Sequence, residues 1–274
     1  MDDIFLEGQK ALIVSEGRTF MVDLDGSVTR LQGARGGIDT SRIIGSRPGE
    51  KMAVGGKEFI ILRPDARDLV QNIRRGAQII IPKDGAHIVY GLGICSGSKV
   101  VEGGAGSGGL TLLLLNAVAP GGTVTTYDIR QDHLDLTAGN VSGAGLSDEW
   151  VIRLGDVSKD VEEKDQDAFV LDVPEPERCL DQVMKALRPG GRFCAYVPTT
   201  NQMERVVLSL EDKGFAFIEP MEIMLRPYSV KEGATRPVNE MLSHTGFMVF
   251  ARWPGSSQAV LDQGPQPRIF DMRE

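Results

Sequence analysis

A glycine-rich stretch at residues 100–112, VVEGGAGSGGLTL, has the composition of a ligand-binding loop. Within it, Gly104, Gly106 and Gly109 have the G-x-G-x-x-G spacing, between an expected strand and an expected helix. Glycine lets the main chain approach a ligand closely because it carries no side chain. The spacing alone fits two ligands, the pyrophosphate of a dinucleotide and the sulfonium of a methyl donor.

Glu102, at the end of the strand before the loop, favours the methyl donor. A carboxylate here repels an approaching pyrophosphate, because like charges repel. It suits a ligand that carries an ammonium and a sulfonium, such as S-adenosylmethionine. The pattern is then Glu102-x-Gly104-x-Gly106-x-Gly108. On these residues alone, an NAD-dependent oxidoreductase is the weaker alternative.

Three more carboxylates follow later expected strands where those strands end. Asp128 is placed to hold ribose hydroxyls, Asp156 to accept from an adenine amino group, and Asp172 follows the next strand. The carboxyl ends of parallel strands meet at one edge of a sheet, where ligands bind in this architecture. A single acid at a strand end is more often a helix cap or a solvated turn residue. Four carboxylates at the ends of successive strands indicate a binding site.

Strands and helices that position these residues alternate from residue 98 onward. Strands are expected at 98–104, 122–129, 150–156, 167–173 and 191–198, and helices at 108–119, 131–145, 177–191 and 201–214. This alternation predicts an α/β fold with a doubly wound, Rossmann-like parallel sheet. Two further strands, at 215–225 and 245–253, are joined by a polar loop and are expected to pair antiparallel at one sheet edge.

The chain before residue 98 has a different pattern. Short apolar runs broken by turns predict a small all-β domain at 1–62. Two helices are expected in 63–97, one between Asp65 and Gly76 and one capped by Asp84. This segment is a helical linker that starts the catalytic domain. The methyltransferase domain then covers 98–253, and a tail rich in Pro, Gly, Ser and Gln covers 254–274.

Composition limits the cellular setting. No apolar run approaches the roughly 20 residues of a membrane helix, and the acidic start lacks the order of a signal peptide. We therefore expect a cytoplasmic protein without a membrane partner. Cys95, Cys179 and Cys194 are too scattered for a disulfide framework or a zinc site, so no metal is expected.

The formal net charge of −8 argues against a strongly basic nucleic-acid binder. A local basic face can nevertheless occur on an acidic protein. The arginines before residue 80 are candidates for such a face: Arg35, Arg42, Arg47, Arg63, Arg67, Arg74 and Arg75.

Residues 235–252, TRPVNEMLSHTGFMVFAR, resemble the closing motif of the tRNA (adenine-58-N1)-methyltransferase family, which is class I and S-adenosylmethionine-dependent. The resemblance extends in order over the glycine loop and over IIIPKD (79–84), YDIRQDH (127–133), LGD, LDVPEP and YVPTTNQ (196–202). It thus spans roughly residues 60 to 252. The resemblance implies methylation of N1 of an adenine in the T-loop of tRNA by a homotetramer, either at position 58 alone or at both 58 and 57.

The resemblance also implies residue roles. Asp172 matches the acid between donor and target base, and Tyr196 matches an aromatic near the base. We expect Asp172 to accept from the exocyclic amino group of the adenine, and Tyr196 to stack on the base unless it packs against a helix. The expected donor-binding residues are Glu102, Gly104, Gly106, Ser107, Gly108, Gly109, Leu110, Asp128, His133, Asp156 and Asp172.

The sequence departs from the family pattern at three places. Ser243 replaces a glycine before HTGF, Glu177 stands where many members have tryptophan, and Ile81 stands where some have an aromatic. His244 is expected to be a hydrogen-bonded core residue at a subunit contact. Two alternative functions share much of the pattern, a protein isoaspartyl O-methyltransferase of the same fold and a non-catalytic tRNA-binding subunit. The complete donor loop argues against the second.

Overall fold

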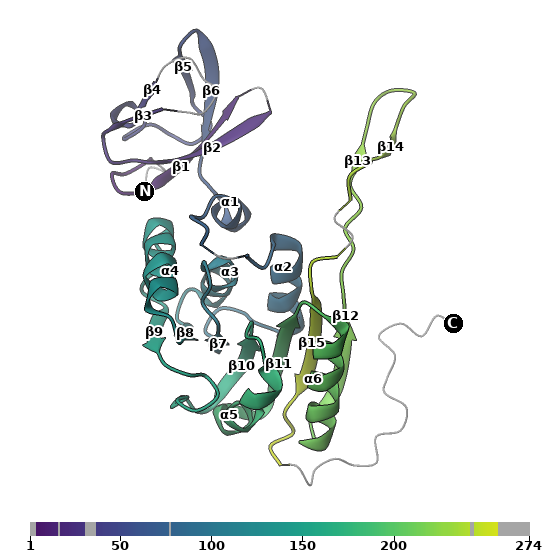
Figure 1. Ribbon diagram of the computed structural model, residues 1–274. Helices are drawn as coiled ribbons and strands as arrows, with labels where there is room; N and C mark the ends of the chain where they lie inside the picture. Colours follow the sequence, from purple (N-terminus) through teal and green to yellow (C-terminus); the bar gives the residue numbers. More distant parts are fainter. Residues whose placement is uncertain (1–3, 16, 31–36, 77, 242–243, 257–274) are drawn as a thin grey trace.

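The computed structural model describes residues 4–15, 17–30, 37–76, 78–241 and 244–256 of the chain. The expectations for Arg35, Ser243 and most of the tail lie outside these residues. Two bodies with separate apolar cores are visible, an N-terminal β structure and a larger α/β structure (Figure 1).

The larger body is built on a seven-stranded sheet of order β12-β15-β11-β10-β7-β8-β9. Its strands are β7 (Lys99–Gly103), β8 (Thr123–Asp128), β9 (Trp150–Leu154), β10 (Gln166–Leu171), β11 (Leu187–Val197), β12 (Ala216–Met221) and β15 (Phe247–Arg252). β7 to β11 run parallel, and β15 runs antiparallel to both β11 and β12. The predicted doubly wound sheet with an antiparallel edge pair is therefore confirmed. Strand order reverses between β7 and β10, which is where open α/β sheets bind ligands.

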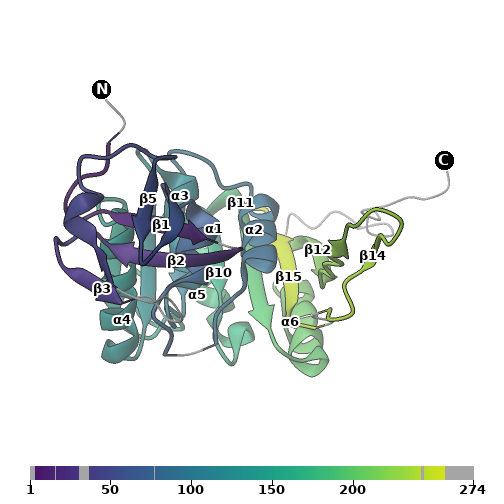
Figure 2. The same ribbon diagram turned by 90° about the horizontal axis from the view of Figure 1, so that it is seen from above.

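Helices cover both faces of this sheet because side chains of each strand alternate between them. Val100 and Val170 pack on the side of α1 (Ala66–Gln71), α2 (Pro82–Gly91), α3 (Gly109–Val118) and α4 (Gln131–Ala144). Val101 and Phe169 pack on the side of α5 (Leu180–Ala186) and α6 (Thr200–Asp212). The two views in Figures 1 and 2 show these layers.

The N-terminal body is all β, as predicted. Its main sheet has the order β2-β1-β6-β5, from β1 (Lys10–Ser15), β2 (Arg18–Asp23), β5 (Lys51–Val54) and β6 (Lys57–Leu62). A second pair consists of β3 (Val28–Arg30) and β4 (Gly37–Asp39), followed by a short 3-10 helix, η1 (Thr40–Arg42). Phe5, Ile13 and Phe59 belong to its core. The end of β6 coincides with the expected boundary at 62, and the other domain boundaries stay predictions.

A thin arm was not predicted. The polar connection between β12 and β15 contains a short hairpin of β13 (Tyr228–Ser229) and β14 (Arg236–Pro237). It projects away from the sheet, on a different side of the molecule from the N-terminal body (Figures 1 and 2).

The helix expected at 177–191 is wrong in its second half. A 3-10 turn, η2 (Pro176–Cys179), leads into α5, which ends at Ala186. β11 then begins at Leu187, which pairs with Gln166. Pro189 cannot donate to a helical ladder, and Gly190 has a φ of 81°, so the helix cannot continue.

The two linker helices also differ from expectation. Asp65 caps α1 as predicted, but α1 ends at Gln71 rather than near Gly76. The Asn140 side chain bonds both the N–H and the carbonyl of Arg74, which replaces the helical hydrogen bonds there. Asp84 does not cap α2. Pro82 begins that helix, so Asp84 falls in its first turn and is fully buried.

Candidate active site

The glycine loop joins β7 to α3 and forms a cradle without side chains. Gly104 has a φ of 94° and Gly108, the residue before α3, has a φ of 81°, both in the left-handed region that favours glycine. A Cβ on Gly104 would lie 2.2 Å from the main-chain oxygen of Asp172, and one on Gly108 would lie 2.8 Å from Thr137 Cγ2. The loop therefore fits closely against the end of β10 and against α4.

Asp128, the last residue of β8, holds this loop in place. Its Oδ2 accepts from the N–H of Ala105 at 3.0 Å and of Gly106 at 3.4 Å. The same oxygen lies 3.1 Å from Nδ1 of His133, and Oδ1 accepts from the N–H of Arg130 at 2.9 Å. The carboxylate, the loop and the start of α4 thus form one cluster, which brings together Asp128 and His133 as predicted.

Glu102 lies beneath the loop and is only 1% exposed. Its Oε2 accepts from the hydroxyls of Thr111 at 2.8 Å and Thr126 at 2.7 Å. Its Oε1 is enclosed and has no hydrogen-bond partner among the described residues. Burial raises the pKa of Glu102 to about 8, against the effect of the two hydroxyls. Glu102 is therefore a buried carboxyl that is protonated near neutral pH, rather than the charged carboxylate expected from the sequence.

Asp172 follows β10 directly, and its N–H donates to the carbonyl of Gly103 at 2.8 Å. The side chain is accessible to solvent, although protein surrounds it on most sides. This desolvation raises the pKa of Asp172 to about 6. Its charge, with that of Asp128, also acts on Glu102. Three of the four expected acids are thus near one another at the switch point of the sheet.

The side chain of the fourth acid, Asp156, binds residues of the turn in which it lies. Its Oδ1 accepts from the N–H and the hydroxyl of Ser158 at 2.9 and 2.6 Å, and its Oδ2 pairs with Lys159 at 2.9 Å. The bonds from Ser158 and Lys159 lower the pKa of Asp156 to about 2. The carboxylate is therefore already satisfied, and contact with an adenine amino group would require it to exchange a partner.

Tyr196 is the neighbour of Asp172 in the next strand. Leu171 pairs with Ala195, so Asp172 and Tyr196 are the following residues of two adjacent parallel strands. The tyrosine is 9% exposed, and its hydroxyl donates to Asp84 Oδ2 at 3.2 Å. A Cβ on Gly246 would lie 2.3 Å from its ring, so this glycine packs against it. The ring is therefore closely packed in this structure, and its role beside the target base stays a prediction.

The remaining loop residues have supporting positions. Ser107 Oγ accepts from the N–H of Gly76 at 3.1 Å, and its carbonyl accepts from Asn140 Nδ2 at 2.9 Å. Leu110 is buried, and its side chain packs in the core with the other apolar residues of α3. Gly109 begins α3, where a Cβ would lie 3.3 Å from Ile79. These contacts fix the loop to the linker that precedes β7.

Comparisons with known proteins agree with this geometry. Residues 59–235 match the family described as the tRNA methyltransferase complex GCD14 subunit. The chain is 34% identical, over 73% of its length and 80% of the relative, to the tRNA (adenine(57)-N(1)/adenine(58)-N(1))-methyltransferase TrmI of Methanocaldococcus jannaschii. The chain belongs to the tRNA (adenine-58-N1)-methyltransferase family.

Other members are similar over comparable lengths. TrmI of Thermus thermophilus is 32% identical, covering 73% of this chain and 80% of the relative. Among solved structures, an S-adenosylmethionine-dependent O-methyltransferase of Thermotoga maritima has a TM-score of 0.83 and 34% identity, covering 91% of this chain and 94% of the other. TrmI of Aquifex aeolicus has a TM-score of 0.76 and 28% identity, covering 91% and 98%. The class I methyltransferase fold is thereby confirmed.

Several residues of this methyltransferase were not predicted as functional. Thr111 and Thr126 hold Glu102, and Asn140 joins the glycine loop to the linker. Ile129 directly follows Asp128 and is 72% exposed, so an apolar side chain lies beside the predicted ribose acid. An apolar residue next to a predicted ribose acid is a signal that the sequence contained.

The residues at which the sequence departs from the family pattern, and His244, have ordinary local contacts. Glu177 pairs with Arg205 at 3.1 Å, and Ile81 is the residue before α2. His244 is not a core residue, since its side chain is 43% exposed. It lies 3.1 Å from the carbonyl of Pro198 and 3.3 Å from Glu222 Oε2.

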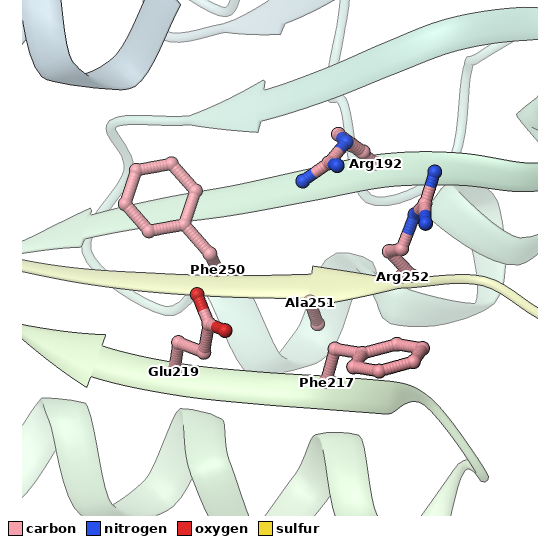
Figure 3. Close-up of a pocket in the computed structure, with 6 residues that line it drawn as sticks. All are labelled: Arg192, Phe217, Glu219, Phe250, Ala251 and Arg252. Carbon is pink, nitrogen blue, oxygen red and sulfur yellow. The ribbon is translucent and has the colours of Figure 1, made fainter. Parts of the chain in front are cut away.

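A groove on the methyltransferase lies away from this site. It is lined by Arg192, Phe217, Glu219, Phe250, Ala251 and Arg252 (Figure 3). Arg192 lies opposite Ala168, near the start of β10, whereas Asp172 and the glycine loop lie at the other, carboxyl ends of the parallel strands. The groove is therefore separate from the donor cradle.

The described ranges contain neither a metal-binding cluster nor a membrane-spanning helix. No group of three or more His, Cys, Asp or Glu residues within them is placed to hold a metal ion. None of the helices in the same ranges is long and apolar enough to cross a membrane.

Proposed function

We propose that this methyltransferase transfers a methyl group from S-adenosylmethionine to N1 of an adenine in the T-loop of tRNA, at position 58 and also at 57. The observation that carries the proposal is the position of Asp172. Its main chain contacts the glycine cradle, its side chain is open to solvent, and Tyr196 is its neighbour in the next strand. One carboxylate thus lies between a donor cradle and an aromatic residue.

The residues present fit such a donor. A Cβ at Gly106 would meet no atom within 4 Å, so the loop borders open space there, and the Glu102 carboxyl supports the loop from beneath. Asp128 and His133 would adjoin the ribose, and Ile129 would offer an apolar contact to the adenine ring. When bound, the donor supplies an electrophilic methyl group on its sulfonium. Asp156 would approach the adenine amino group only after releasing Ser158 or Lys159.

The chemistry assigned to Asp172 follows from charge. Adenine N1 is a weak nucleophile, and methylation there places positive charge on the ring. A carboxylate that accepts from the exocyclic amino group stabilises this charge as it develops and can take the amino proton. A pKa of about 6 leaves the carboxylate ionised at neutral pH yet more basic than an ordinary aspartate. Asp172 also orients the base, because methyl transfer requires alignment of the reacting atoms.

Binding of tRNA requires base extrusion and phosphate contacts. An adenine in a folded loop must leave its stack to reach the site, which costs a few kcal/mol. Exposed arginines on and near the linker would bind phosphates and offset this cost. The candidates that the structure describes as exposed are Arg42, Arg47, Arg63, Arg67, Arg74 and Arg75.

We also propose a homotetramer in the cytoplasm. Apolar side chains of the arm and its base, including Leu225, Tyr228 and Val230, are more than half exposed. Exposed apolar groups gathered on one projecting segment are typical of a protein contact surface. Light scattering coupled to gel filtration tests the assembly; a monomer across the concentration range would contradict it.

The substrate class is tested by offering one enzyme two acceptors. Purified protein with labelled donor is incubated with an unmodified tRNA transcript and, separately, with an isoaspartyl peptide. We expect label in the tRNA only. Label in the peptide would favour the O-methyltransferase alternative, the reaction class to which the similar Thermotoga maritima protein is assigned. Binding of tRNA without methyl transfer would favour the non-catalytic subunit.

A further inference from the structure

A buried ion pair lies beside the proposed base site. Lys83 and Asp84, in the first turn of α2, have side chains that are 9% and 0% exposed, and Lys83 Nζ donates to Asp84 Oδ1 at 2.6 Å. Lys83 also donates to the carbonyl of Ile223, which follows β12, at 2.7 Å. Because removing charges from water is costly, a buried pair needs nearly complete hydrogen bonding to persist.

Thr245 completes this hydrogen bonding. Its Oγ1 accepts from Lys83 Nζ at 2.8 Å and donates to Asp84 Oδ2 at 2.6 Å. The same carboxylate oxygen accepts from the Tyr196 hydroxyl at 3.2 Å. All three protons of Lys83 and both oxygens of Asp84 therefore have partners. The network joins the PKD and HTGF motifs, whose chemical use the donor site leaves unexplained.

The network ends at Tyr196, which is the neighbour of the proposed catalytic residue Asp172. Tyr196 and Asp172 follow paired residues of β10 and β11. Alternation places both on the sheet face that carries Val170 and Cys194, which is the face covered by α2. Burial, reinforced by the Asp84 charge, raises the pKa of Tyr196, so its phenol stays protonated and donates.

We propose that Lys83, Asp84 and Thr245 are positioning residues that fix the Tyr196 hydroxyl and thereby hold the Tyr196 ring in register with Asp172. Lys83 compensates the buried charge of Asp84, and Thr245 keeps both groups aligned. The tyrosine thus acts as a fixed wall of the base site. This inference rests on the proposed function, because the wall matters only when a base is presented to Asp172.

Thr245 offers matched variants for the test. Thr245→Val keeps the shape but removes the hydroxyl between Lys83 and Asp84, whereas Thr245→Ser keeps the hydroxyl. Tyr196→Phe removes the hydroxyl that donates to Asp84. The Tyr196→Phe/Thr245→Val double variant completes a double-mutant cycle, which measures the coupling between the two positions. For each protein the measurements are kcat and KM for tRNA, donor affinity by titration, and the thermal midpoint, with kinetics recorded well below that midpoint.

We expect Thr245→Val and Tyr196→Phe each to lower kcat roughly tenfold, the effect of one lost hydrogen bond. The double variant should be about as slow as either single variant, because both act through one group. Donor affinity should change less than about twofold, and Thr245→Ser should recover most of the turnover.

Three results would overturn the inference: wild-type turnover in Thr245→Val, single effects that multiply in the double variant, or a loss of donor affinity that parallels the loss of turnover. A purely structural role would lower the thermal midpoint of Thr245→Val without lowering its kcat. If the wild-type enzyme fails to methylate tRNA, the proposed function fails and the inference with it. If the wild type is active and the variants equal it, only the inference fails.

Discussion

Gly104 and Asp172 approach so closely that a Cβ on the glycine would lie 2.2 Å from the main-chain oxygen of the aspartate. The donor cradle and the proposed catalytic acid are therefore in direct contact, although they lie in different strand-end loops. Any change that widens the cradle must also move Asp172.

We predict that Gly104→Ala weakens donor binding more than roughly tenfold and lowers the thermal midpoint. The methyl group collides with main chain rather than with a flexible side chain, and the φ of 94° adds strain of about 1–2 kcal/mol. Titration with the donor and thermal melting measure the two effects. Gly139→Ala is the control, since Gly139 is exposed in α4 with open space around its Cβ position; it should be neutral or slightly stabilising. Wild-type donor affinity in Gly104→Ala would contradict the close contact.

The Glu102 carboxyl predicts a specific pH dependence of stability. Its pKa is raised from 4.5 to about 8 in the folded protein. The stabilising contribution is therefore complete below about pH 4.5 and is lost as pH rises toward 8, at up to roughly 1.4 kcal/mol per pH unit. Glu102→Gln cannot ionise but keeps an oxygen for the two threonine hydroxyls. We expect this variant to gain stability relative to wild type across that range.

Urea unfolding at several pH values, without donor, measures the difference between the two proteins. Other titrating groups are common to both and cancel. Glu50→Gln, a change at an exposed position, serves as the control and should follow wild type. Parallel stability curves for wild type and Glu102→Gln would show that Glu102 is not held in its neutral form.

Replacement of Asp172 should separate binding from turnover. We predict that Asp172→Asn keeps donor affinity within about twofold and loses roughly 10² to 10⁴ in single-turnover rate, as expected for a positioned base. In wild type the rate should be half-maximal near pH 6 and approach its full value about one pH unit higher, because Asp172 with its raised pKa must lose its proton to act. Asp212→Asn, an exposed change in α6, should behave as wild type. An unchanged single-turnover rate in Asp172→Asn would reject this role.

The linker arginines predict a salt-dependent contribution to tRNA binding. Arg74 is exposed, and its main chain is fixed by Asn140, which also bonds the glycine loop. We expect Arg74→Ala to weaken tRNA binding, to reduce the slope of log affinity against log salt by about 1, and to leave donor affinity unchanged. Arg188→Ala is the control, because Arg188 pairs with Asp167 at the opposite end of the sheet. A near-zero slope in wild type would contradict a basic face altogether.

The sheet was predictable because its signals are local. Alternating strand and helix patterns located all the strands of the seven-stranded sheet, and three of the acids at strand ends lie near one another at its carboxyl edge. The predicted helix ends were wrong where a contact with a distant residue, or a turn, overrides the local sequence pattern. Asn140 ends α1 early by bonding Arg74, 66 residues away. Pro189 and Gly190 turn an apparent helix end into the start of β11.

The contacts of the site residues were likewise not predictable from local sequence patterns. Glu102 was correctly located at the loop, but its burial depends on Thr111 and Thr126, whose positions follow from packing. Asp84 had the sequence context of a cap, yet its partner Thr245 lies 161 residues later. Hydrogen-bond networks between distant segments have no periodicity, so the sequence alone does not reveal them.

The central claim, methylation of adenine N1 in the T-loop, is tested most directly by mapping the product. An unmodified tRNA transcript is incubated with enzyme and labelled donor, digested, and its nucleosides and fragments are identified by mass spectrometry. We predict 1-methyladenosine at position 58, with 57 as the second site, and its loss when those adenines are replaced. A methyl group on another atom or nucleotide, or methyl transfer to a peptide but not to tRNA, would contradict the account.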